Sequence, residues 1–97
     1  MNLARVLEEG LGSLILNKFY TSEDELCDKL LTLLNLEDGD LDLIGDNKKG
    51  IKEFNFVFHL DDKKYNLYIC CYVLVDKTLV PYACVVSEKN DELEWAI

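Results

Sequence analysis

Carboxylates crowd one short stretch of the chain, which reads EDGDLDLIGD. The spacing of Asp38, Asp40 and Asp42 matches the first three ligand positions of an EF-hand calcium loop. Such a loop also needs a glycine at its sixth position and a bidentate glutamate at its twelfth. Leu43 and Lys49 occupy those two positions, and Lys49 puts a cation where an anion is required. We therefore do not expect calcium binding, and we interpret the stretch as a solvated strand flank that follows a turn.

The four cysteines and the single histidine do not form a pattern typical of catalysis or of zinc binding. No two cysteines have the C-x-x-C spacing of a zinc site. Cys70 and Cys71 are adjacent, so on a strand they point to opposite faces and cannot hold one ion together. His59 is expected on a neighbouring strand, several residues away from Cys70. No phosphate-binding loop, catalytic triad or kinase motif is present, and we expect a protein that is not an enzyme and uses no metal or cofactor.

The net charge of −9 is concentrated in residues 21–46, where nine acids face one lysine. Phosphates would be repelled by such a stretch, so direct binding to nucleic acid is not expected. A basic protein is the partner that this charge favours, because complementary charge speeds association. We predict that the acids form a partner-binding patch made of Glu23, Asp24, Glu25, Asp28, Glu37, Asp38, Asp40, Asp42 and Asp46.

Length and composition indicate one compact domain over residues 1–97. A chain of 97 residues rarely supports two cores, and 49% hydrophobic residues with one proline is a globular composition. No apolar run reaches the roughly 18 residues that span a membrane, and the N-terminus lacks the features of a signal peptide. We expect a cytoplasmic protein, of the producing or a host cell, with reduced cysteines and no contact with membranes.

Two helices are predicted first. Asn2 is a candidate N-cap, and leucines recur at helical spacing up to Ile15, although Gly10 leaves the continuity of this helix open. The second helix begins at a capping box, Ser22 to Glu25, and its leucine stripe ends near Asn35.

Strands follow, because the period of the apolar residues changes to two. Alternation predicts strands at Phe54–Leu60, Tyr65–Val75, Val80–Val86 and Leu93–Ile97, with a short strand at Asp40–Ile44 beside them. Turns centred on Asp62–Lys63 and Lys77–Thr78 would pair Phe58 with Leu67, Val73 with Tyr82, Cys71 with Cys84 and, in a third hairpin, Val86 with Leu93. All three hairpins then bring apolar residues to the same face. The expected fold is α+β, with two N-terminal helices packed on one face of a four- to five-stranded antiparallel β-meander.

The opposite face of this sheet is unusually rich in tyrosine and aliphatic residues for a surface exposed to water. We predict a partner-binding or dimer surface centred on Val57, Tyr68, Tyr72 and Leu74. Two alternatives stay open for this face. One helix could cross over and cover it, or the tyrosine hydroxyls could simply reach water.

In size, acidity and lack of motifs the chain resembles phage anti-defence proteins, including anti-CRISPR inhibitors, and bacterial toxin-immunity proteins. That resemblance is compositional and implies a stoichiometric inhibitor of a basic protein, such as a nuclease or another nucleic-acid-binding enzyme. The acidic patch would then mimic the phosphates of DNA. The alternative is a dimeric chaperone-like or structural adaptor module. Small acidic type III secretion chaperone-like domains also join an N-terminal helix to a meander, but they insert a further helix between strands that this chain lacks.

Overall fold

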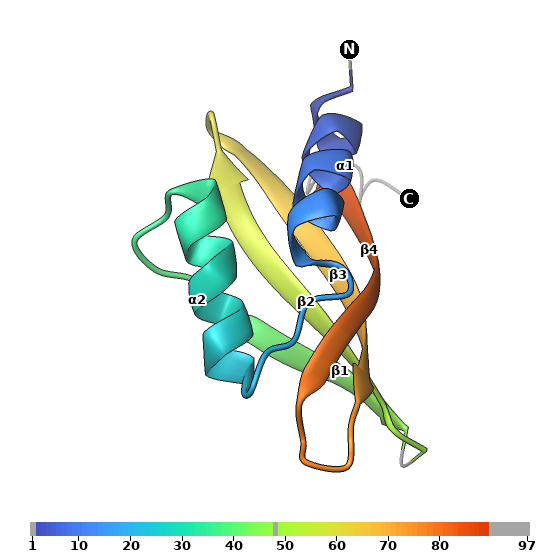
Figure 1. Cartoon of the computed structure of the whole chain (residues 1–97). Helices are drawn as coiled ribbons and strands as arrows, with labels where there is room; N and C mark the ends of the chain where they lie inside the picture. Colours follow the sequence, from blue (N-terminus) through green and yellow to red (C-terminus); the bar gives the residue numbers. More distant parts are fainter. Residues whose placement is uncertain (1, 48, 90–97) are drawn as a thin grey trace.

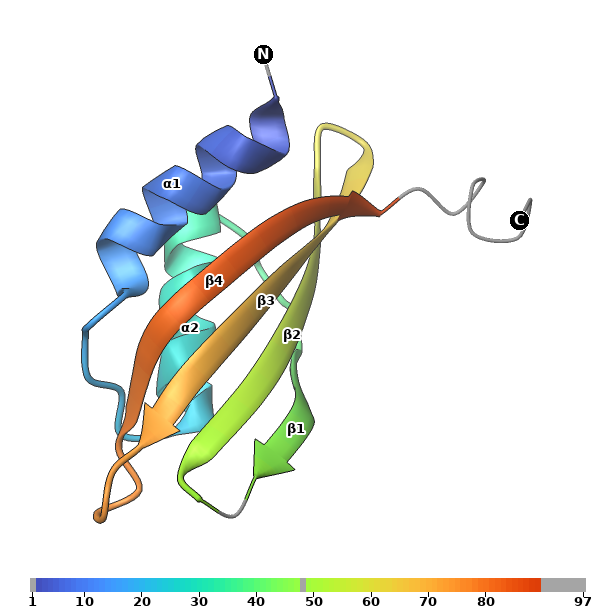
Figure 2. The ribbon, with the colours of Figure 1, turned by 90° about the vertical axis from the view of Figure 1, so that its right-hand side faces the viewer.

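A computed structural model describes residues 2–47 and 49–89 of the chain. Its elements, in chain order, are α1 (Leu3–Ile15), α2 (Glu23–Leu34), β1 (Leu41–Asn47), β2 (Ile51–Leu60), β3 (Lys63–Val73) and β4 (Leu79–Lys89). The strands form an antiparallel sheet in the order β1-β2-β3-β4, and both helices lie on one face of it (Figure 1, Figure 2). The predicted α+β meander is confirmed. The expected strand at Leu93–Ile97 and its pairing with Val86 fall outside the described residues.

Both helices begin at their predicted N-caps, and α2 ends at Asn35 as predicted. The side chain of Asn2 accepts a hydrogen bond from the backbone N–H of Arg5, and α1 continues without a break through Gly10. The hydroxyl oxygen of Ser22 accepts the N–H of Glu25 at 3.1 Å, which caps α2. Asn35 then ends α2 in the left-handed conformation, at φ 55°.

The β2–β3 hairpin differs from the expected register by two residues. Its turn is centred on Asp61 and Asp62, both at positive φ, so Phe58 pairs with Tyr65 and not with Leu67. A tight two-residue turn of this type needs positive φ at both central positions, and aspartate tolerates that conformation better than lysine. Because the shift is an even number of residues, the predicted core face of both strands is unchanged.

The β3–β4 hairpin departs further from the prediction. Its loop is longer than two residues, with Lys77 at φ 73°, and Val73 pairs with Leu79. A β-bulge at Tyr82 then shifts the register, so Leu79, Pro81, Cys84 and Val86 face the core while Tyr82 faces away. The predicted pairs Val73–Tyr82 and Cys71–Cys84 are wrong because the longer loop moves the register by three residues and the bulge moves it back by one. Cys71 pairs with Pro81, and Cys84 pairs with Ile69.

The core lies between the two helices and the inner face of the sheet. Three aromatic rings stack in a row there, with centroids 6.0 Å apart for Phe56 and Phe58 and 5.4 Å apart for Phe58 and Tyr65. They pack with the other fully buried side chains, which include Ile15, Leu26, Leu30, Phe54, Leu67, Ile69 and Cys71. This layer fixes the orientation of the sheet and leaves its other face uncovered by either helix.

Candidate protein-binding surfaces

The nine acids of the predicted patch lie along α2, the loop that follows it and β1. Glu23, Asp24 and Glu25 occupy the first turn of α2, where the helix dipole favours negative charge. The chain then passes through the α2–β1 loop into the edge strand β1 (Figure 1). Most of the nine side chains are exposed, and Glu23 is half-buried. We call this set of nine residues the acidic surface.

The α2–β1 loop is held close to the core at Gly39. A Cβ atom at this position would lie 2.8 Å from the ring of Phe56, so a larger residue would push the loop away from the sheet. The thiol of Cys27 donates a hydrogen bond to the carbonyl of Gly39 at 3.4 Å, from the side of α2. Both contacts fix the position of the neighbouring carboxylates Asp38 and Asp40.

Few cations neutralise the acidic surface. Within the part of the chain that the structure describes, Glu23 is its only member in an ion pair, at 3.8 Å from the ammonium group of Lys52. Glu25 instead accepts hydrogen bonds from the N–H and the hydroxyl of Thr21, and these bonds hold the pKa of its carboxyl below the ordinary value. The surface therefore presents mostly unpaired carboxylates to solvent.

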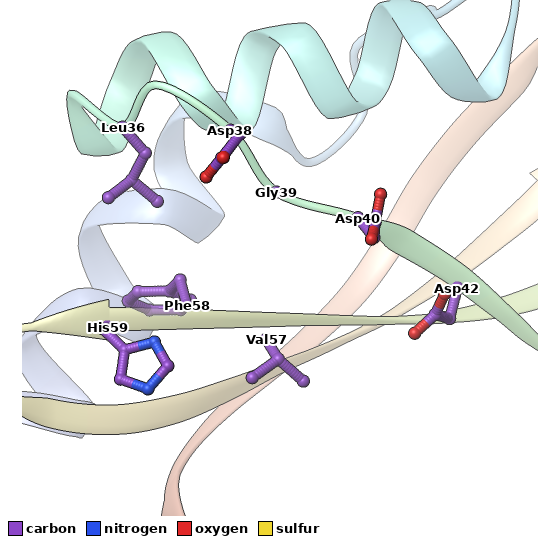
Figure 3. A pocket seen from close by; sticks show the side chains of 8 residues that line it. All are labelled: Leu36, Asp38, Gly39, Asp40, Asp42, Val57, Phe58 and His59. Atoms are coloured by element: carbon purple, nitrogen blue, oxygen red, sulfur yellow. The ribbon is translucent and has the colours of Figure 1, made fainter.

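A hollow of about 370 Å³ opens where β2 extends past the start of β1. The carboxylates of Asp38, Asp40 and Asp42 lie along its rim, and His59 closes the far end (Figure 3). Val57 and Phe58 add apolar groups on opposite sides of β2, with Phe58 on the helix side (Figure 3). Among the described residues, no three histidine, cysteine or acidic side chains come together in a way that could hold a metal ion. A hollow lined by both carboxylates and apolar groups instead suits the long side chain of a lysine or an arginine.

The second predicted surface lies on the sheet face opposite the helices, which we call the outer face. Val57, Tyr68 and Tyr72 are on it, whereas Leu74 lies just beyond the end of β3 in the hairpin loop. The helices do not cross over to cover this face (Figure 2). The side chains that alternate onto the outer face are therefore not covered by α1 or α2.

Tyr82 belongs to the outer face but was expected in the core. The bulge turns it outward, and its ring stacks on Tyr72 with centroids 4.3 Å apart and planes at 25°. Pro81 could have indicated this bulge from the sequence, because proline within a strand is found at sheet edges and bulges. Beside this pair, the hydroxyl of Tyr68 donates a hydrogen bond to the carboxylate of Glu53. Side-chain hydrogen bonding with Cys70, and then with Glu53, raises the pKa of Tyr68 above its ordinary value.

His59 and Cys70 do not form a catalytic pair. His59 pairs with Lys64 near the start of β3. Cys70 lies six residues further along β3, opposite Glu53. The geometry of the two side chains provides no nucleophile with an adjacent base.

No known protein family, curated protein or solved structure matches the chain. No helix among the described residues is long and apolar enough to cross a membrane. The function is therefore inferred from the two surfaces themselves.

Proposed function

We propose that this chain is a small, non-enzymatic interaction protein that binds a basic protein in stoichiometric amount through its acidic surface. The observation that carries the proposal is the placement of nine acids on α2, the following loop and β1, with only Glu23 in an ion pair among the described residues. The partner class is a nuclease or another nucleic-acid-binding enzyme, whose basic groove the carboxylates would occupy in place of phosphates. Anti-CRISPR-like and toxin-immunity proteins act in this manner, and a cytoplasmic location suits both.

Charge and shape contribute differently to such a complex. Carboxylates at exposed positions increase the rate of encounter and add little affinity each, because water screens them. Affinity needs a desolvated anchor, and the hollow bounded by Asp38, Asp40 and Asp42 provides a place for one. A lysine or arginine of the partner would enter it with its aliphatic stem against Val57 and its charge among the carboxylates.

The test compares two variants with the same change in net charge. The first converts Asp38, Asp40, Asp42 and Asp46 to asparagine. The control converts four exposed acids elsewhere to amides, namely Glu9, Asp61, Asp62 and Glu88. Each protein is immobilised and used to capture partners from a host lysate at low salt, and the captured protein is then titrated with wild type and variants.

We expect wild type and control to retain one basic protein in stoichiometric amount. The first variant should bind that protein with an association rate at least about tenfold lower at low salt, and the difference should shrink as salt is added. Wild type should also displace nucleic acid from the captured protein. Equal loss of binding in both variants would show that net charge, and not the position of the carboxylates, controls binding. Unchanged association kinetics in the first variant would reject the acidic surface as the binding site.

A further inference from the structure

The outer face of the sheet exposes more apolar surface than an open antiparallel sheet normally does. Tyr72 is 49% exposed, Val85 52% and Tyr82 36%. The stacked rings of Tyr72 and Tyr82 form a rigid aromatic platform at the Leu79 end of β4. Contiguous apolar surface of this kind is typical of a surface that another protein covers.

The charges on this face are few and lie apart. Over β2, β3 and the described side chains of β4 they are Glu53 and Lys64, with His59 beside Lys64 and Asp42 on the neighbouring edge strand. Glu53 is already bonded to the hydroxyl of Tyr68. A strongly basic partner would be drawn to the acidic surface, whereas this face suits a partner that is equally poor in charge.

The dimensions of the face fit a small, symmetric interface. Its long strands have 10, 11 and 11 residues. With a rise of about 3.3 Å per residue and strands about 4.8 Å apart, the face measures about 33 Å by 15 Å. This flat area of about 500 Å² is smaller than the ~800 Å² that each partner contributes to a standard interface. Nearly the whole face must therefore be used, which two flat sheets achieve by packing face to face at about 10 Å.

We propose that a second copy of this chain covers the outer face, forming a two-fold symmetric dimer in which the two sheets pack face to face. The two rows that carry the charges lie at different levels of the sheet, since Lys64 pairs with His59 and Glu53 pairs with Cys70. A two-fold axis that crosses the strands midway between these rows brings the Lys64 end of each copy over the Glu53 end of the other. The face is thus complementary to itself, as a symmetric interface requires.

This dimer leaves the exposed carboxylates of α2 and of the α2–β1 loop free, although it covers Val57, which also lines the hollow. The two associations also respond to salt in opposite ways. Two copies with a charge of −9 each repel one another, so added salt should tighten the dimer. Salt should weaken binding to a basic partner. Failure of one proposal is therefore distinguishable from failure of the other.

The test is sedimentation equilibrium of the whole chain from about 1 µM to about 500 µM, at low and moderate salt. Wild type should pass from monomer to dimer in this range. Tyr72→Lys and, as a second variant, Val85→Lys should weaken the dimer by at least about tenfold, since each buries an unpaired ammonium group. Val6→Lys on α1 is the matched control, because Val6 is 48% exposed on the helical side.

A thiol measurement checks the same interface without any substitution. Cys70 lies half-buried on the outer face, whereas Cys71 is fully buried in the core, where burial raises its pKa to about 12. The reaction of Cys70 with a maleimide, followed by peptide mapping, should slow as protein concentration rises through the dimer range. A wild type that stays monomeric throughout, a control that dissociates as much as Tyr72→Lys, or a Cys70 rate independent of concentration would each overturn the proposal.

Discussion

The carboxylate of Glu8 on α1 accepts a hydrogen bond at 2.9 Å from the backbone N–H of Val86 on β4, 78 residues further along the chain. The same edge of β4 is bonded at two more points. Tyr20 exchanges backbone hydrogen bonds of 2.9 and 2.7 Å with Leu79, and the N–H of Asn17 donates to the carbonyl of Pro81 at 2.8 Å. Helix α1 and the linker after it thus satisfy backbone groups that a further strand would otherwise bond, which protects this edge from pairing with other chains.

The first prediction concerns Glu8→Ala. This substitution leaves the N–H of Val86 without its acceptor in a partly buried position, and we expect the free energy of unfolding to fall by about 1–2 kcal/mol. Glu9→Ala is the matched control. Glu9 is one residue away, forms an exposed i,i+4 pair with Arg5, and should change stability by less than about 0.5 kcal/mol. Urea denaturation followed by circular dichroism measures both, and equal effects of the two variants would contradict the role of Glu8.

Much of the fold follows from local signals in the sequence. The caps at Asn2 and Ser22 fix the starts of both helices, and the alternation in β2 and β3 identifies their core faces even though the predicted register was wrong by two residues. These signals depend on neighbours in the chain, so they can be read from the sequence.

Features that depend on distant contacts could not be predicted. The bulge that turns Tyr82 outward is favoured by Pro81 but is set by how β4 fits against α1 and β3. Glu8 looks like any acid on an exposed helix until β4 is placed beside it. For the acidic surface, the sequence identified the residues and their excess of charge. The hollow beside Asp42 arises only because β2 extends past the start of β1, a matter of strand register.

The second prediction concerns Tyr65, whose hydroxyl is buried. Among the described residues this oxygen has no hydrogen-bond partner, and the side chain is 1% exposed. Burying an unsatisfied hydroxyl costs about 1–3 kcal/mol, so Tyr65→Phe should leave stability unchanged or raise it by about 1–2 kcal/mol. Tyr68→Phe provides the contrast, since it removes a hydroxyl that donates to Glu53 and should lower the melting temperature. A loss of about 1 kcal/mol or more in Tyr65→Phe, measured by thermal unfolding, would show that the hydroxyl is satisfied.

The third prediction concerns the pH dependence of Glu25 at the start of α2. The hydroxyl and the N–H of Thr21 donate to its carboxylate, and these bonds lower its pKa from the ordinary value of 4.5. A carboxyl whose pKa is depressed in the folded state stabilises the protein above the unfolded-state pKa. That contribution is lost as the pH falls from about 4.5 through the lower folded-state pKa.

Thr21→Val should therefore raise the pKa of Glu25 toward its ordinary value without restoring it fully, because the N–H of residue 21 still donates. A carbon-detected NMR titration of the side-chain carboxyl measures the change directly. Thr32→Val is the control, since the hydroxyl of Thr32 donates to the carbonyl of Asp28 on the same helix and does not contact Glu25. A pKa of Glu25 that is the same in Thr21→Val and wild type would show that the hydroxyl contributes nothing. An equal rise of the Glu25 pKa in Thr32→Val would show that the change comes from a general effect on α2 and not from the Thr21 hydroxyl.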